Sequence, residues 1–232
     1  MELPGPLIRA RFLRREGRFK GYVEVGGEVA SVHIHDPGRL AELLKPGAVA
    51  WVRPHSKEGL RTRFYLTLVE QGGCRVLVDS SLHSKIVEEG LRLGRVAELE
   101  GYRVVRREGA FRGGRVDFVV QGPGGERGLL EVKGCTLVRG GTALFPDAPT
   151  ARGLRHLRAL AEAAGEGLEA YVLFLVPHCR AVEFRPNFEA DPRFSRALAE
   201  AVERGVVAMA YKAEVREGSV ELARPLPVRL GP

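Results

Sequence analysis

The chain has 232 residues, 44% of them hydrophobic and 28% charged, and its formal net charge at pH 7 is +7. This composition is ordinary for a globular protein. No apolar run approaches the roughly 20 residues of a membrane-spanning helix, and the N-terminus lacks the apolar stretch of a signal peptide. We therefore expect a cytoplasmic protein with no membrane partner, whose basic charge favours a polyanion.

The first 80 residues contain five strand-like runs, separated by turn residues such as Gly26-Gly27 and Gly72-Gly73. Several short strands at this spacing are typical of a small barrel. A five-stranded barrel of the OB type suits the length, and "GRLAELL" (38–44) predicts a short helix within it. We therefore predict an OB-like nucleic-acid-binding domain over residues 1–80.

From residue 81 the pattern changes to helices and strands that follow one another. Apolar residues at helical spacing predict a helix over 80–101, capped by Ser80 or Ser81. Three strand-like runs follow, and then a helix over 151–167, a buried strand over 168–177, a helix over 192–205 and a strand over 206–215. This order predicts a second domain over 81–232, with helices on the faces of a mixed sheet.

The three cysteines, Cys74, Cys135 and Cys179, are odd in number and widely spaced. They fit neither a disulfide framework nor a zinc-ligand pattern, so we predict three reduced thiols. Amide side chains are scarce and charged ones abundant. That balance is compatible with a thermophilic source, and also with a biased base composition of the gene.

The stretch "RVDFVVQGPGGERGLLEVKG" (115–134) predicts a hairpin of two apolar strands that nevertheless carry charges. Strand side chains alternate between faces. One face of the hairpin is therefore apolar, and the other carries Asp117, Glu131 and Lys133. If the turn makes the strands neighbours, Asp117 lies beside Glu131. The predicted apolar face consists of Val116, Phe118, Leu130 and Val132.

Two adjacent carboxylates raise each other's pKa unless a cation lies between them. A hard divalent ion such as Mg²⁺ or Mn²⁺ is such a cation, and it needs only one or two protein carboxylates. The carbonyl of Val132 offers a third ligand, and Lys133 can orient the attacking water. Asp117, Glu131 and Lys133 thus predict a site for phosphodiester hydrolysis; the alternative is an ion-pair cluster on an exposed sheet.

The spacing Asp117…Glu131-Val132-Lys133 resembles the PD-(D/E)xK nuclease superfamily. Together with "VHIHDPGRLAELLKPGAVAWV", "FPDAPTARGLRHL" and "GVVAMAYKAEV", it makes nearly the whole chain similar to the sugar fermentation stimulation protein A family. That resemblance implies an OB-like first domain, a restriction-endonuclease-like second domain and DNA binding. The superfamily often adds a helix glutamate to the metal site, for which we predict Glu89, with Glu88 as the alternate; a solvated helix face is the other interpretation.

Phosphate contacts are predicted on the helix that begins near residue 151. Arg152 and His156 are four residues apart and therefore share a helical face. Arginine offers a bidentate fork to phosphate, whereas His156 is equally compatible with a structural hydrogen bond. Thr150 is a candidate cap for the helix.

The first domain offers further candidate contacts to nucleic acid. Gly38 is expected to begin the short helix, whose amides can bind an anion with help from Arg39. Basic residues alternate with aromatic ones in "RARFLRREGRFKGY" (9–22), which includes Arg11, Arg18 and Lys20. Such a mixture is typical of OB surfaces that bind nucleic acid, although a charged strand edge has the same composition. A metal site at His33 and His35 is disfavoured because four ligands are not present.

We therefore predict a Mg²⁺- or Mn²⁺-dependent nuclease whose partner is single- or double-stranded DNA. The alternative is a non-specific DNA-binding regulator of sugar (maltose) metabolism genes that has no significant cleavage activity. A homodimer is compatible with the sequence, which does not demand one.

Overall fold

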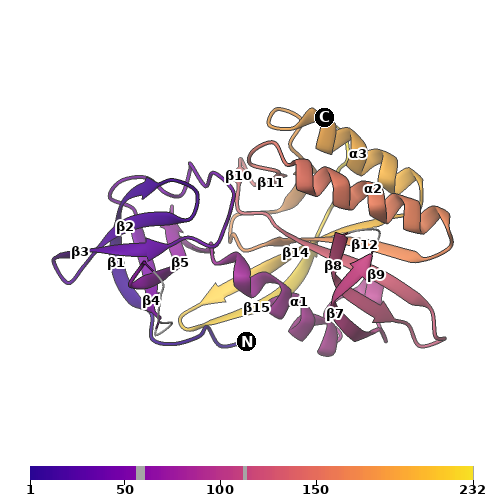
Figure 1. Cartoon of the computed structure of the whole chain (residues 1–232), viewed down its shortest axis with the longest axis horizontal. Coiled ribbons are helices and arrows are strands. Elements are labelled where there is room, and N and C mark those ends of the chain that lie inside the picture. Colours follow the sequence, from indigo (N-terminus) through magenta and orange to yellow (C-terminus); the bar gives the residue numbers. More distant parts are fainter. Residues whose placement is uncertain (56–60, 112–113, 232) are drawn as a thin grey trace.

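The computed structural model describes residues 1–55, 61–111 and 114–231. A small β-barrel lies beside a larger body in which helices cover a sheet (Figure 1). No helix in these ranges is long and apolar enough to cross a membrane. The strands of the barrel are β1 (Ile8–Glu16), β2 (Lys20–Val25), β3 (Glu28–His33), β4 (Val49–Pro54), β5 (Phe64–Gln71) and β6 (Cys74–Leu77).

The barrel has the strand order expected of an OB fold. Its strands follow the order β3-β2-β1-β4-β5, and a parallel pairing of β3 with β5 closes the cylinder. Strand β6 extends β5 as a hairpin. Inward-facing residues such as Phe12, Val23 and Leu66 are fully buried and fill the barrel. The predicted five-stranded barrel is therefore confirmed.

The short helix predicted over residues 38–44 is wrong. Leu40 has a φ of 51°, outside the helical region, and only a single turn follows it, closed by Leu44 N and Leu40 O at 2.8 Å. The amide of Leu40 is instead bound by the carboxylate of Asp147, at 3.0 Å. Because this amide and that of Gly38 already meet carboxylates, the predicted anion site at a helix N-terminus does not form.

The second body contains a six-stranded mixed sheet in the order β15-β14-β12-β9-β8-β7. Its central strands β9, β12 and β14 are parallel, and the outer pairs are antiparallel. A three-stranded sheet lies beside it. The elements are η1 (Ser80–Leu82), α1 (His83–Arg92), η2 (Ala97–Leu99), β7 (Arg103–Phe111), β8 (Gly114–Gln121), β9 (Arg127–Gly134), β10 (Val138–Arg139), β11 (Thr142–Phe145), α2 (Ala151–Gly165), β12 (Glu169–Val176), β13 (Glu183–Pro186), α3 (Pro192–Glu203), β14 (Val207–Arg216) and β15 (Ser219–Leu226).

Each face of the large sheet is covered by helix, as predicted (Figure 1). Helices α2 and α3 lie over one face and share a core with β12, whereas α1 lies over the other. The barrel contributes Leu68 and Leu77 to the core under α1. The barrel and the sheet are therefore joined by apolar packing as well as by the chain.

Three features of the second body differ from the prediction. The helix expected over 80–101 is divided into η1, α1 and η2, because Gly94 takes a φ of 65° after the last turn of α1. The cap is Asp79, which accepts a hydrogen bond from Ser81 N at 3.2 Å, rather than either serine. Strands β10, β11, β13 and β15 were not predicted, since they are short or edge strands.

The prediction of three reduced thiols is wrong for two of them. Cys74 of β6 and Cys179, which follows β12, form a disulfide that ties the barrel to the second body. Their Cα atoms are 5.7 Å apart although 105 residues separate them in the chain, so their spacing alone could not reveal the pair. Cys135 is free and buried.

Two polar contacts reinforce the junction between barrel and sheet. Gln71 Oε1 lies 2.9 Å from His178 Nε2, next to the disulfide. The bond from Leu40 N to Asp147 joins the barrel to the loop before α2. These contacts place the surface of the barrel in a defined position relative to the large sheet.

The carboxyl group of Asp36, at the junction, is protonated more easily than an ordinary aspartate. Burial, together with nearby Asp147, raises the pKa of Asp36 to about 6, although the Gly38 amide and Arg15 oppose the shift. An unfolded aspartate titrates near 3.9, so the folded chain binds more protons between these values. We expect the free energy of unfolding to fall as pH rises from about 4 to 6, and Asp36→Asn to remove about 1–3 kcal/mol of that loss.

Urea unfolding at both ends of this pH window would measure the slope. Glu28→Gln, which removes a carboxylate from the exposed surface of the barrel, is the control and should leave the slope unchanged. An Asp36→Asn protein with the same pH dependence as the parent would contradict the assignment.

Candidate functional site

The charged residues of the β8–β9 hairpin gather where the pairing of these two strands ends. The ladder runs from Gln121–Arg127 to Phe118–Leu130. At the next position the Asp117 carboxylate, through Oδ2, accepts the hydrogen bond of Val132 N at 2.7 Å. The side chain of Asp117 therefore lies against strand β9 at the Glu131–Lys133 segment.

The predicted apolar face of the hairpin is correct in three of its four residues. Phe118, Leu130 and Val132 pack into the core under α1. Val116 packs into the opposite core, under α2 and α3. At Val116 strand β8 is no longer paired with β9, and the neighbouring strand β7 is irregular, since Glu108 has a φ of 47°. The regular alternation of side chains between faces therefore does not extend to Val116.

Glu131 is the centre of the site. Its side chain is almost fully buried, the residue being 4% exposed. The Oε1 atom accepts hydrogen bonds from Lys133 Nζ and from His156 Nδ1 of α2. Arg152 Nε lies 3.4 Å from the other ring nitrogen of His156. This pattern places the imidazole proton on Nδ1, so that Nε2 accepts from Arg152.

The two carboxyl groups of the site differ in their ease of ionisation. Burial and the neighbouring Glu131 raise the pKa of Asp117, despite the Val132 amide. Burial acts in the same direction on Glu131, but His156 and Lys133 outweigh it and lower the pKa of that residue. An added cation between the two would therefore favour the ionised form of Asp117.

Two oxygen atoms of this pair fit a divalent ion. Among the described residues, Glu131 Oε2 is buried and has no hydrogen-bond partner, and Asp117 Oδ1 meets only the hydroxyl of Ser84, at 3.5 Å. Within the described ranges, no three His, Cys, Asp or Glu side chains are arranged to hold a metal. Mg²⁺ commonly uses one or two carboxylates and keeps several waters, so the two oxygens suit it.

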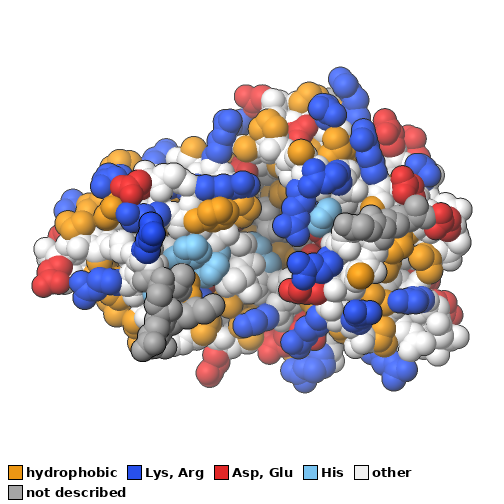
Figure 2. Space-filling model, in the orientation of Figure 1, with side chains coloured by type: hydrophobic (Ala, Val, Ile, Leu, Met, Phe, Trp, Pro, Cys, Tyr) orange, Lys and Arg blue, Asp and Glu red, His pale blue; other side chains and the backbone are white. Residues whose placement is uncertain are grey.

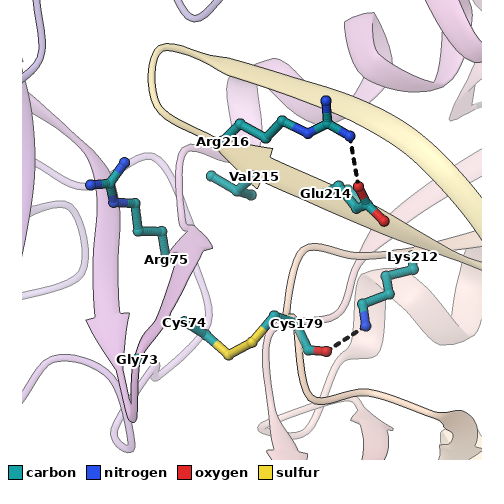
Figure 3. Close-up of a pocket in the computed structure, with 9 residues that line it drawn as sticks. Gly73, Cys74, Arg75, Cys179, Lys212, Glu214, Val215 and Arg216 are labelled. Atoms are coloured by element: carbon teal, nitrogen blue, oxygen red, sulfur yellow. Dashed lines mark hydrogen bonds and ion pairs between the residues drawn. A yellow bond between two sulfur atoms is a disulfide. The ribbon is translucent and has the colours of Figure 1, made fainter.

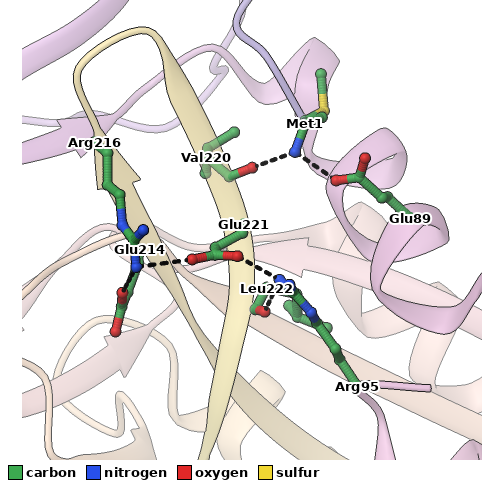
Figure 4. Close-up of polar contacts among 8 residues, drawn as sticks. All are labelled: Met1, Glu89, Arg95, Glu214, Arg216, Val220, Glu221 and Leu222. Atoms are coloured by element: carbon green, nitrogen blue, oxygen red, sulfur yellow. Dashed lines mark hydrogen bonds and ion pairs between the residues drawn. The ribbon is translucent and has the colours of Figure 1, made fainter. Parts of the chain in front are cut away.

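The structure does not bring Glu89 to this pair. The carboxylate of Glu89 binds the amino group of Met1, which also donates to Val220 O at 2.7 Å (Figure 4). The prediction of Glu89 beside Asp117 is therefore wrong in this conformation. Successive side chains on a helix point about 100° apart. Ser84 and Glu88 lie on the face of α1 that meets Asp117, and Glu89 therefore points away from it.

The alternate, Glu88, is held by Arg107 of β7 at 2.9 Å. Glu88 is four residues after Ser84 and so lies on the same side of α1. Sequence reasoning missed Ser84, which could have been found by asking which residues precede Glu88 by one helical turn.

Helix α2 is positioned by two capping residues. Thr150 accepts from Gly153 N at 3.1 Å, which confirms its predicted role. Asp191, which caps α3, also accepts from Thr150 N at 2.8 Å and so fixes the start of both helices. This arrangement directs Arg152 and His156 of α2 toward Glu131.

The basic residues predicted on the barrel lie away from the carboxylates. Arg11 pairs with Glu24, and Lys20 with Glu16 at 2.8 Å. Arg18 and Arg39 are exposed. These four residues thus form part of the barrel surface and not of the carboxylate site.

A separate surface pocket of about 520 Å³ lies beside the disulfide (Figure 3). Cys74, Cys179, Lys212 and Glu214 are among its lining residues. None of the residues around Glu131 contributes to it, so the pocket and the carboxylate site are distinct.

Comparison with known proteins agrees with the fold. The family described as "SfsA N-terminal OB domain" matches residues 13–78, and "Sugar fermentation stimulation protein RE domain" matches residues 81–219. A sugar fermentation stimulation protein homolog of Pyrobaculum neutrophilum is 50% identical over 99% of this chain and 97% of its own. The chain belongs to the sugar fermentation stimulation protein family. Both the predicted family and the predicted fold class are confirmed.

Other members of the family resemble the chain over its whole length. The Moorella thermoacetica homolog is 40% identical over 99% of this chain and all of its own. A solved structure of Pyrococcus furiosus SfsA in complex with Ca²⁺ has 31% identity and a TM-score of 0.92, and covers 99% of this chain and 98% of that one.

Proposed function

We propose that this family member is a Mg²⁺- or Mn²⁺-dependent nuclease that hydrolyses phosphodiester bonds in DNA. The observation that carries the proposal is the buried Oε2 of Glu131 next to Asp117, which has no hydrogen-bond partner in the described part of the chain. A buried anionic oxygen without a donor is costly unless a cation binds it. The Ca²⁺ complex of the Pyrococcus furiosus relative supports a hard cation in this fold.

The surrounding residues suit this chemistry. A bound Mg²⁺ or Mn²⁺ supplies positive charge at the scissile phosphate and lowers the pKa of a bound water. Asp117 and Glu131 would hold the ion, and the carbonyl of Val132 would be a third ligand. Lys133 orients the water and offsets negative charge, while Arg152 binds the phosphate and His156 keeps Arg152 and Glu131 in register.

DNA is the proposed substrate because the protein is basic. Lys and Arg side chains are frequent on the face of the molecule in Figure 2, and the net charge is +7. Arg11, Arg18, Lys20 and Arg39 of the barrel are proposed contacts to the phosphate backbone.

Incubation of DNA with the protein in Mg²⁺ or Mn²⁺, and in EDTA, tests the proposal. We expect cleavage only with the metal, and none by a variant carrying Asp117→Ala and Glu131→Ala. Salt-dependent binding without cleavage by either protein would favour the DNA-binding regulator instead.

A pair of adjacent substitutions on α1 tests whether the helix contributes a third carboxylate. We expect Glu88→Gln to lower Mg²⁺ affinity by about 10-fold, because Glu88 shares the face of Ser84, whereas Glu89→Gln should change it by less than about 2-fold. Calorimetric titration with Mg²⁺ measures both. Equal effects would show that the metal site does not use α1, and a larger effect of Glu89→Gln would restore the sequence-based assignment.

A further inference from the structure

We propose that the barrel binds single-stranded nucleic acid by stacking unpaired bases on a cluster of aromatic and histidine rings. This ring cluster consists of Phe19, His33, His35, His55 and Tyr65. The inference shares with the proposed function only the assumption that nucleic acid is the partner, and it goes beyond that function because it selects the strandedness and places the binding surface.

Strand pairing places the centre of the ring cluster between two cations. Lys20 of β2 is opposite His33 of β3, His33 is opposite Tyr65 of β5, and Tyr65 is opposite Arg53 of β4. Residues directly opposite in neighbouring strands share a face of the sheet. All four are partly exposed, so the outer wall of the barrel carries a transverse row of cation, ring, ring and cation.

The rings hold one another in fixed orientations. The ring centroids of His35 and His55 are 4.7 and 4.6 Å from that of Tyr65, and His33 meets Tyr65 edge-on at 5.8 Å. These separations are those of favourable aromatic pairs. Phe19, at the edge of the cluster, is stacked over His33 at 6.3 Å and is 44% exposed. A base can therefore add to an existing stack without ordering new side chains.

The histidines of the ring cluster are arranged for stacking and not for metal binding. His33 and His35 meet edge to face at an angle of 79°, and no metal-holding group of side chains occurs among the described residues. Burial and nearby His35 lower the pKa of His33, so that this imidazole is neutral at pH 7. The neutral ring of His33, next to Tyr65 and Phe19, offers an apolar face.

The chemistry favours unpaired nucleotides over a duplex. Base faces are accessible only when the bases are unstacked, whereas a duplex presents phosphates and groove edges. Lys20 lies at one end of the row, and at the other end the guanidinium of Arg53 lies over the Tyr65 ring, 4.3 Å from its centroid. The guanidinium of Arg18 lies 5.4 Å from the Phe19 ring centroid. Rings for bases between cations for phosphates are the combination that single-strand-binding OB folds use.

The ring cluster and the carboxylate site are anchored to the same short segment. Asp79, fully buried at the end of the barrel, accepts from Arg53 at 2.8 Å and lies 3.0 Å from His35 Nδ1. Ser84, five residues after Asp79, contacts Asp117. Five residues of helical chain span roughly 9 Å, so that Asp79 and Ser84 lie close together. Histidine side chains are visible on both sides of the central hollow in Figure 2. A strand of about 4–16 nucleotides, as OB folds cover, can reach both.

Fluorescence anisotropy with the full-length protein in EDTA tests the inference without cleavage. The probes are a labelled oligothymidylate of about 15 nucleotides and a duplex of the same length. We expect tighter binding of the single strand, and a loss of about 5- to 100-fold on Phe19→Ala and on Tyr65→Leu. Tyr65→Phe, which keeps the ring, should retain affinity within about 3-fold, and so should Val29→Ala, which shortens a 65% exposed apolar side chain elsewhere on β3.

The inference is overturned if Phe19→Ala and Val29→Ala bind the oligothymidylate equally. It is also overturned if the ring substitutions lower the affinities for the single strand and for the duplex by the same factor. Phe19 is exposed at a turn, so its substitution keeps the test valid if Tyr65→Leu fails to fold. If the ring substitutions weaken binding and the protein does not cleave DNA, the nuclease proposal is rejected and the ring cluster is supported. If they leave binding unchanged and the protein does cleave DNA, the nuclease is supported and the ring cluster is rejected.

Discussion

Glu131→Gln is expected to lower metal-dependent DNA cleavage by at least about 10²-fold. Lys133 and His156 both bind Glu131, whose buried Oε2 receives no hydrogen bond from the residues that the structure describes. Glutamine keeps the shape of the side chain but removes the charge that a hard cation requires. The cleavage rate at saturating Mg²⁺ measures the effect.

A second measurement separates a lost metal site from a lost fold. An ion that binds only the folded state raises the melting temperature. Mg²⁺ should therefore raise the melting temperature of the parent protein and not that of Glu131→Gln. Glu183→Gln is a matched control, since Glu183 is also a strand glutamate that accepts two hydrogen bonds, from Thr142 and Arg185 at 2.9 Å each. Parent-like cleavage by Glu131→Gln would contradict the proposed site.

Short-range patterns predicted the centre of the candidate site. Two strands and a tight turn bring Asp117, Glu131 and Lys133 together through alternation alone, and four-residue spacing puts Arg152 and His156 on one side of α2. Each of these relations lies within one element or one hairpin. The order of the elements predicted helices on the faces of the sheet, but the contact of His156 with Glu131, which joins the two groups, was not predicted.

Relations between distant segments could not be predicted in this way. The choice between Glu88 and Glu89 depends on the rotation of α1, which is fixed by packing against β15 and the barrel. The ring cluster depends on the parallel pairing of β3 with β5, which places His33 beside Tyr65. Neither relation has a local signal. An amphipathic helix tolerates a glutamate at either position on its polar side, and the pairing of β3 with β5 joins segments that are distant in the sequence.

Cys74→Ala is expected to lower the free energy of unfolding by about 3–5 kcal/mol. The disulfide closes a loop of more than a hundred residues, since 105 positions separate Cys74 from Cys179. In the loop-closure account, such a long loop loses the most conformational entropy in the unfolded chain. Guanidinium unfolding of the parent protein and the variant, both without reductant, measures the difference.

Reduction and substitution should be equivalent if the disulfide is the cause. The parent in dithiothreitol is expected to match Cys74→Ala, and Cys179→Ala in the same chain should add little, because the two cysteines act as one cross-link. Cys135→Ala, a control at the free buried cysteine, should keep its sensitivity to reductant. Three titratable thiols in the unreduced, denatured parent would restore the sequence-based expectation. One thiol would support the Cys74–Cys179 cross-link, with Cys135 as the free cysteine.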